Sequence, residues 1–163
     1  MNPPKPFETA IIASPEDFSP IREDNKVIGA FNPGVTTIET PRGLETILFV
    51  RVAETPRKRM PGKILLPYFH ILNAEQLPPK LDCDIVDRKT FIIRKKEVTP
   101  KKGPIRLRHI SLPRMVVLNT DREMSKIYQE PAISPSWEFD RFGLEDVRIT
   151  HLEDGRFVIT YAT

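Results

Sequence analysis

Proline is the residue that most limits what this chain can fold into. The sequence of 163 residues contains 17 prolines spread over its whole length, about twice the usual share. Proline has no backbone N–H and clashes with the preceding helical turn, so helix interiors exclude it, whereas strand ends and turns tolerate it. The distribution therefore predicts short strands joined by turns and argues against long helices.

A β-hairpin is predicted in the first third of the chain. β-branched and aromatic residues are frequent in residues 27–38 and 46–52, as is typical of strands. Between these runs lies Thr40-Pro41-Arg42-Gly43, whose proline and glycine favour a turn.

The middle of the chain predicts further strands with less regular patterns. Short apolar runs at residues 64–72 and 84–94 are set among prolines and lysines. Apolar and polar side chains alternate through residues 105–109, and another apolar run follows at 115–118. This last part is predicted to form one strand, or two strands broken at Pro113.

A second hairpin is predicted at the end of the sequence. Strand patterns at residues 147–152 and 156–161 flank Glu153-Asp154-Gly155, and Asp-Gly is among the strongest hairpin signals. No stretch has sustained helical periodicity. The chain is therefore predicted to be all-β, with repeated antiparallel hairpins that suit a propeller, a sandwich or a barrel.

The composition bounds the class of protein. Hydrophobic residues make up 39% of the chain, which argues against disorder. Cys83 is the single cysteine, so an internal disulfide is excluded. No apolar run approaches the roughly 20 residues of a membrane span or forms a signal peptide. We therefore expect a soluble cytoplasmic protein with no membrane contact.

Basic residues are concentrated in the middle of the chain, whose net charge is +3. Such a group indicates either a surface for phosphate or nucleic acid, or a solvated loop. The solvated loop is favoured, and no nucleic-acid partner is expected, because no aromatic residues alternate with the charges. The residues are Arg57, Lys58, Arg59, Lys63, Lys95, Lys96, Lys101 and Lys102.

Glu145-Asp146-Val147-Arg148 is the segment most suggestive of chemistry. Strand side chains alternate between faces, so Asp146 and Arg148 are predicted to share one face. A carboxylate beside a guanidinium is held ionised and can bind ligand hydroxyls, but a surface salt bridge has the same pattern.

Other polar positions leave the same choice open. Asn32 lies in a turn-like Asn-Pro-Gly, Arg51 ends an apolar run, and His109 lies within a predicted strand. Each is either a ligand contact or an ordinary structural residue. Neither a metal-ligand spacing nor a glycine-rich phosphate loop is present, so no metal is expected.

Several motifs, in order, resemble glycoside hydrolase family 130, the mannoside phosphorylases and their hydrolytic relatives. They are GAFNPGV, ILFVR, IRLRHISLPRM, YQEPAI and FGLEDVRITHLEDGRFVITYAT. The resemblance implies a five-bladed β-propeller, of which only about the first two blades are present, the N-terminal part of a longer enzyme. Residues 1–24 would form an N-terminal arm and 25–163 the partial propeller, with a basic insertion at about 53–104.

The resemblance also implies a reaction and its residues. Asp146 matches the family's catalytic acid, whose proton passes through the 3-hydroxyl of the mannosyl unit to the glycosidic oxygen. Inorganic phosphate then attacks with inversion and yields mannose 1-phosphate, with no metal or organic cofactor. Asn32 and Arg51 match positions that line the mannosyl site. Substrate contacts are further expected from Glu145, Arg148 and His109.

Alternatives follow from what this sequence lacks or changes. The residues that separate phosphorylases from hydrolytic β-mannosidases lie in later blades, so a β-mannosidase is the second hypothesis. The sequence stops directly after a strand, so a truncated inactive fragment, or a sugar-binding module without turnover, is the third. Val147 stands where the family has proline, and the strand is expected to survive this change. Exposed blade edges and the basic insertion would also allow a homo-oligomer.

Overall fold

The structure, a computed structural model, describes residues 10–71, 79–94, 97–100 and 105–163. These residues form eleven strands and three short 3-10 turns, with no α-helix among them. The predicted all-β class is therefore confirmed. In this described part, no helix is long and apolar enough to cross a membrane.

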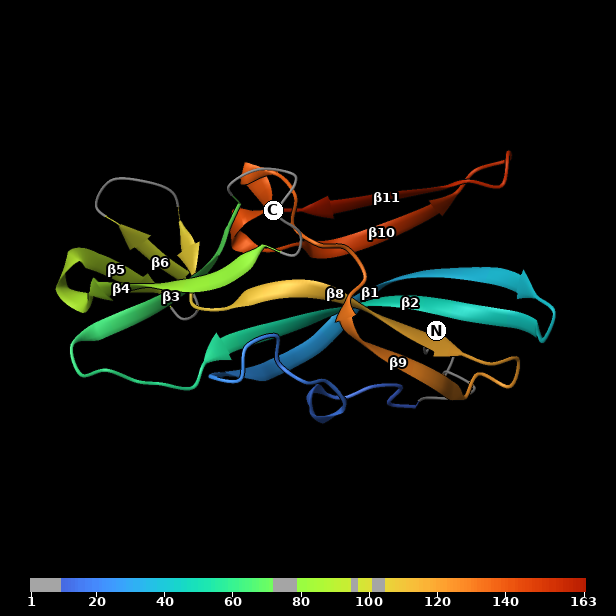
Figure 1. Cartoon of the computed structure of the whole chain (residues 1–163), viewed down its shortest axis with the longest axis horizontal. Helices are drawn as coiled ribbons and strands as arrows, with labels where there is room; N and C mark the ends of the chain where they lie inside the picture. Colours follow the sequence, from blue (N-terminus) through green and yellow to red (C-terminus); the bar gives the residue numbers. More distant parts are fainter. Residues whose placement is uncertain (1–9, 72–78, 95–96, 101–104) are drawn as a thin grey trace, which may run out of the picture.

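A four-stranded antiparallel sheet is the centre of the fold, in the order β1-β2-β8-β9 (Figure 1). Its first two strands are the predicted N-terminal hairpin, which is confirmed and longer at both ends than its pattern indicated. Its pairing runs from Asn25 opposite Pro56 to Thr40 opposite Gly43. The strands are β1 (Asn25–Thr40), β2 (Gly43–Pro56), β8 (Ile110–Leu118) and β9 (Met124–Pro131).

β8 decides between the two alternatives that the sequence left open, a single strand or two strands broken at Pro113. The strand is continuous through this proline and pairs with β2 from Ile110 to Leu118. On its other side, pairing with β9 reaches only Arg114, opposite Pro131, so Pro113 lies where the missing N–H disrupts least. β9 has no counterpart among the predicted strands, because its mostly exposed side chains leave no apolar pattern.

Two smaller sheets lie between β2 and β8 in the sequence. β3 (Lys63–His70) pairs with β4 (Lys80–Asp87). The second sheet consists of β5 (Phe91–Arg94), β6 (Glu97–Pro100) and β7 (Arg106–Leu107). The predicted single strand at 84–94 is wrong, because the 3-10 turn η2 (Arg88–Thr90) interrupts it. The Asp87 carboxylate accepts a hydrogen bond of 3.0 Å from the Lys89 N–H and ends β4 there.

The C-terminal hairpin is also confirmed, as β10 (Glu145–His151) paired with β11 (Phe157–Ala162). It is a separate two-stranded sheet that runs beside β1 in Figure 1. Two further 3-10 turns are η1 (Pro15–Asp17), before the central sheet, and η3 (Glu138–Phe142), before β10. None of the sheets in the described ranges closes on itself.

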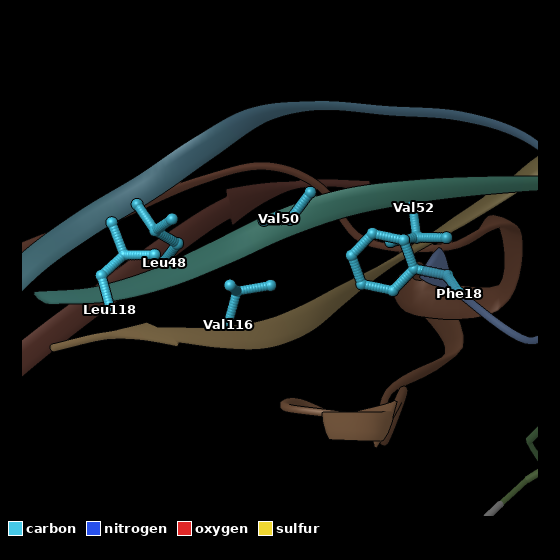
Figure 2. Packing of buried hydrophobic residues seen from close by; sticks show 6 residues of the cluster. All are labelled: Phe18, Leu48, Val50, Val52, Val116 and Leu118. Atoms are coloured by element: carbon cyan, nitrogen blue, oxygen red, sulfur yellow. The ribbon is translucent and has the colours of Figure 1, made fainter. Parts of the chain in front are cut away.

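The central sheet has a compact apolar core on one face. Inward side chains of β2 and β8 alternate with outward ones, and Phe18, from the segment before β1, packs over them. Burial of each such side chain contributes about 1.5–3 kcal/mol. Figure 2 shows the six buried residues: Phe18, Leu48, Val50, Val52, Val116 and Leu118.

A second apolar cluster joins the β3–β4 sheet to the central sheet. Phe69 and Leu81 of β3 and β4 pack with Ile110 and Leu112 of β8 and with Leu144. Leu144 is fully buried and directly precedes β10, so it anchors the start of that strand next to β8.

The division of the chain into an arm, a partial propeller and a basic insertion remains a prediction. Residues 1–9 of the arm lie outside the described residues, as do Lys95, Lys96, Lys101 and Lys102 of the basic segment.

Candidate functional site

Two irregular strand positions bring polar side chains together. Asn32 in β1 and Asp146 in β10 have positive φ, at 47° and 49°, a backbone conformation in which asparagine and aspartate are enriched. Both lie at register shifts, between Phe31 and Gly34 in β1 and between Glu145 and Arg148 in β10. The Asn32 Nδ2 donates a hydrogen bond of 3.1 Å to the Asp146 Oδ1, so two distant motifs meet here.

Glycines permit the close approach of these strands. A Cβ on Gly34 would lie 2.7 Å from the Val147 carbonyl oxygen, so any side chain there would push β1 away from β10. Gly143, with φ of 106°, similarly passes over Ser111 of β8. The next residue, Leu144, donates its N–H to the Ser111 carbonyl at 2.8 Å. These two contacts place the start of β10 against both β1 and β8.

Arg51 is the central cation of the site. Its Nη1 donates to the Asp146 Oδ1 at 3.1 Å, and its Nη2 donates to the Glu145 Oε1. Its Nε donates to the Ser111 Oγ at 3.2 Å. The side chain is only 11% exposed, and its Cζ lies 4.9 Å from the centre of the Phe31 ring. Arg51 therefore fixes both carboxylates from one side.

Glu145 is held by a second, deeper set of contacts. The Ser111 Oγ donates to its Oε1 at 3.2 Å, and the His109 Nε2 lies 3.7 Å from the same oxygen. Burial opposes ionisation of Glu145, but His109 and the charge of Arg51 outweigh it and lower its pKa. Glu145 is therefore an ionised partner of Arg51 at neutral pH.

The predicted pairing of Asp146 with Arg148 is wrong. The register shift and the positive φ at Asp146 break the simple alternation of side chains, so Glu145 and Asp146 both reach Arg51. Arg148 is exposed, and its Nη1 donates to the carbonyl oxygens of Asp146 and Val147 at 3.4 and 3.0 Å. Val147 lies within β10 and is 1% exposed, so the strand forms with valine at this position, as expected.

The structure thus gathers five of the six predicted site residues into one connected group, which we call the Arg51 cluster: Asn32, Arg51, His109, Glu145, Asp146 and, not predicted, Ser111. Arg148 lies beside it without joining its side-chain contacts in the described residues. Ser111 was detectable only as a lone hydroxyl within an apolar run. Within the described ranges, no group of three or more His, Cys, Asp or Glu residues, in the Arg51 cluster or outside it, has the arrangement of a metal site.

The contacts of Asp146 favour its carboxylate form. Hydrogen bonds from Asn32 and then from Arg51 lower its pKa, because both stabilise the ionised form. A lowered pKa means that these contacts stabilise the fold at neutral pH. That contribution is lost as the pH falls through the lowered pKa.

Replacing Asn32 is expected to raise the pKa of Asp146. We choose Asn32→Gly because glycine adopts the positive φ of this position without strain while the amide donor is removed. The measurement is a pH titration of the Asp146 carboxyl carbon by NMR. Asp154, whose pKa is lowered by Arg156, is an internal control and is expected to titrate unchanged. An unaltered Asp146 titration would show that Arg51 alone holds this carboxylate ionised.

Comparison with known proteins finds similarity to a mannoside phosphorylase. No protein-family profile matches the chain. The chain is similar to a β-1,2-mannobiose phosphorylase from Listeria innocua, with 28% identity over 152 residues. It is also similar to the solved structure of a Listeria innocua β-1,2-mannobiose phosphorylase in complex with β-1,2-mannobiose, with a TM-score of 0.72 and 28% identity.

The shared part is limited in extent. The sequence match covers 91% of this chain and 41% of the relative, in its N-terminal part, and the structural match covers 92% and 41%. The chain thus spans less than half of the length of that relative. The resemblance to mannoside phosphorylases that the motifs predicted is confirmed by this homologue.

Proposed function

We propose that this chain forms part of the active site of a β-mannoside phosphorylase and supplies its proton donor, Asp146. The observation that carries the proposal is the Arg51 cluster, in which separate family-like motifs meet around one carboxylate. Similarity to a β-1,2-mannobiose phosphorylase supports the substrate class.

We also propose that this chain forms part of a β-propeller. A propeller blade is a four-stranded antiparallel sheet, and the β1-β2-β8-β9 sheet has this size and pairing. We infer that it is one blade and that β10 and β11 begin the next, in a five-bladed arrangement. The Arg51 cluster then lies where two adjacent blades meet, since β1, β2 and β8 belong to one and β10 to the other.

The reaction requires one proton and one nucleophile. In an inverting mechanism, the acid and the attacking group act on opposite faces of the sugar. Asp146 gives its proton to the 3-hydroxyl of the mannosyl unit, which passes its own proton to the glycosidic oxygen. The bond from the anomeric carbon to that oxygen breaks, and an oxygen of inorganic phosphate bonds to the carbon. The products are mannose 1-phosphate and the released sugar.

The other residues take roles that follow from their contacts. Arg51 is a positioning residue, because both of its Nη groups are engaged by carboxylates. Glu145, with His109 and Ser111 behind it, holds Arg51 in place. Asn32 aims the Asp146 carboxylate and is itself exposed toward the substrate side. Arg148, exposed beside Asp146, contacts the sugar or the phosphate.

Because the pKa of Asp146 is lowered, substrate binding has to raise it before Asp146 can act as an acid. A general acid must hold a proton when the substrate is bound, whereas the free protein favours the carboxylate. A phosphate anion bound nearby would raise the pKa of Asp146 by like-charge repulsion. Phosphate would therefore act as the nucleophile and would also favour the protonated form of Asp146.

The test is an assay of β-1,2-mannobiose cleavage with and without inorganic phosphate, following mannose 1-phosphate and free mannose. It is run on this chain and on a chimera in which the chain replaces the matching N-terminal part of the Listeria innocua protein. We expect the chimera to form mannose 1-phosphate only when phosphate is present.

Two results would overturn the proposal. Free mannose produced by this chain itself, at the same rate with or without phosphate, would identify a hydrolase. A folded chimera that binds phosphate and mannobiose but forms neither product would remove the Arg51 cluster from catalysis. The unmodified Listeria innocua protein is the positive control for both.

A further inference from the structure

A basic cavity of about 190 Å³ lies where the end of β2, the start of β3 and the turn η2 come together. Seven of its twelve lining residues are lysine or arginine. Arg57, Lys58 and Arg59 come from the segment between β2 and β3. Among the described residues, no acidic side chain lines the cavity, and it shares no residue with the Arg51 cluster.

The four remaining cations come from widely separated parts of the chain. Lys26 lies in β1, Lys63 in β3, Arg88 in η2 and Arg108 before β8. Folding is therefore needed to bring these cations together. A run of charges within one loop would be close together in the unfolded chain as well. In water such like charges repel one another, and the repulsion is relieved when an anion binds between them.

Little in the described part of the chain neutralises these charges. Lys63 lies 3.6 Å from an Asp87 carboxylate oxygen, and this is the one described ion pair that involves a lining residue. Arg57 donates through Nε to the Asn25 carbonyl oxygen at 2.6 Å. A neutral carbonyl orients the guanidinium without cancelling its charge.

The cavity has a fixed framework as well as charge. The Thr55 hydroxyl donates to the Arg108 carbonyl at 2.8 Å, and the Arg88 N–H donates to the Gly62 carbonyl at 2.9 Å. The Arg57 N–H donates to the Asp24 carbonyl, also at 2.8 Å. Ile64 also lines the cavity and is 4% exposed. These contacts hold the backbone of four segments, at residues 24, 55–64, 88 and 108, around one cavity, unlike a loosely solvated loop.

We propose that this cavity binds a small phosphorylated ligand, either inorganic phosphate or a phosphate monoester. Guanidinium and ammonium groups from several directions suit a phosphate dianion with its outward-facing oxygens. The volume is below the roughly 300–1,000 Å³ of pockets for drug-sized ligands, which favours a small anion. A nucleic acid is disfavoured because no aromatic residue lines the cavity for base stacking. The inference does not rest on the proposed phosphorylase reaction.

The experiment is a titration of the isotope-labelled chain in phosphate-free buffer, followed by amide NMR. The probes are inorganic phosphate, mannose 1-phosphate and a short single-stranded oligothymidine. We expect saturable binding of one phosphate or monoester, with shifts centred on residues 55–65, on Arg88 and on Arg108. Added salt is expected to weaken the binding, because the cations are exposed. If inorganic phosphate binds more tightly than mannose 1-phosphate, the ligand is free phosphate; the opposite order identifies a phosphate monoester.

Two matched double variants distinguish binding at this cavity from a general effect of the net charge of the protein. K58Q/R59Q removes two lining cations, and R42Q/K126Q removes the same charge from exposed positions in the β1–β2 turn and β9. The first is expected to weaken binding about tenfold, the loss when two exposed charge interactions disappear, and the second is expected to have no effect.

Each contrary outcome would overturn the proposal. Equal weakening by both variants would mean that only net charge matters. Absence of saturable binding would leave a solvated basic surface. Oligothymidine binding that is tighter than either small anion and lost in K58Q/R59Q would mean a nucleic-acid surface. Because shifts at residues 55–65 are read separately from those at the Arg51 cluster, binding of mannose 1-phosphate to the proposed active site cannot imitate this result.

Discussion

Asp146→Asn is expected to lower mannobiose turnover in the chimera about 10²–10⁴-fold, the usual contribution of a general acid, while the fold is retained. An asparagine side chain keeps an oxygen that can accept the hydrogen bonds now donated by Asn32 and Arg51. It has no proton of suitable acidity to give to the substrate. The measurements are the rate of mannose 1-phosphate release and the thermal unfolding midpoint.

The control for this variant is Asp154→Asn in the turn between β10 and β11. The two aspartates have similar side-chain exposure, 45% for Asp146 and 50% for Asp154, and each contacts an arginine. Asp154 lies outside the Arg51 cluster, so its replacement is expected to leave turnover unchanged. Near-normal turnover of Asp146→Asn would remove this residue from the mechanism, and similar losses in both variants would indicate a general effect on β10 and β11.

The two hairpins were predictable from sequence because their signals are local. Asp-Gly between two apolar runs fixes the C-terminal hairpin, and a proline and a glycine mark the turn of the other one. β9 carries no such signal, since its side chains are mostly exposed. The η2 turn depends on one side-chain hydrogen bond from the Lys89 N–H to Asp87, which no pattern of apolar residues reveals.

The sequence indicated which residues come together around Arg51 better than it indicated which of their side chains contact one another. Motif resemblance indicated Asp146, Asn32 and Arg51, but alternation along a regular strand assigned Asp146 to Arg148. That rule holds only where φ and register are regular, and β10 has a register shift and a positive φ at this point. Such irregularities concentrate at functional sites, and the simple strand rule fails at the site that we propose.

Ser111 illustrates a different limit. Its hydroxyl contacts Arg51 and Glu145, which are 60 and 34 residues away in the sequence. Nothing in the apolar run around it indicates which charged residues will face it. The approach of β10 to β8 over Gly143 creates this contact, and that approach is a tertiary feature.

The second large effect is expected from Glu54→Leu, which should lower the free energy of unfolding by about 3–5 kcal/mol, as when one member of a buried ion pair is removed. Glu54 and Arg114 are each 2% exposed and lie 3.0 Å apart, Oε1 to Nη2. Glu54 also accepts the Ile21 N–H at 3.0 and 2.9 Å through its two oxygens. Its loss would leave the buried guanidinium with only the Ser19 carbonyl, 3.5 Å from Nη2, and would remove the acceptor of the Ile21 N–H.

Burial raises the pKa of Glu54 and lowers that of Arg114, so desolvation already opposes both charges in the native protein. The double variant Glu54→Leu/Arg114→Met is therefore expected to recover most of the loss, because apolar residues can replace a buried pair at little cost. Urea unfolding followed by circular dichroism measures both variants. A double variant as unstable as Glu54→Leu would mean that the contact with Ile21, rather than the stranded charge, carries the effect. The pair would then act mainly by holding the segment around Phe18 over the core of the central sheet.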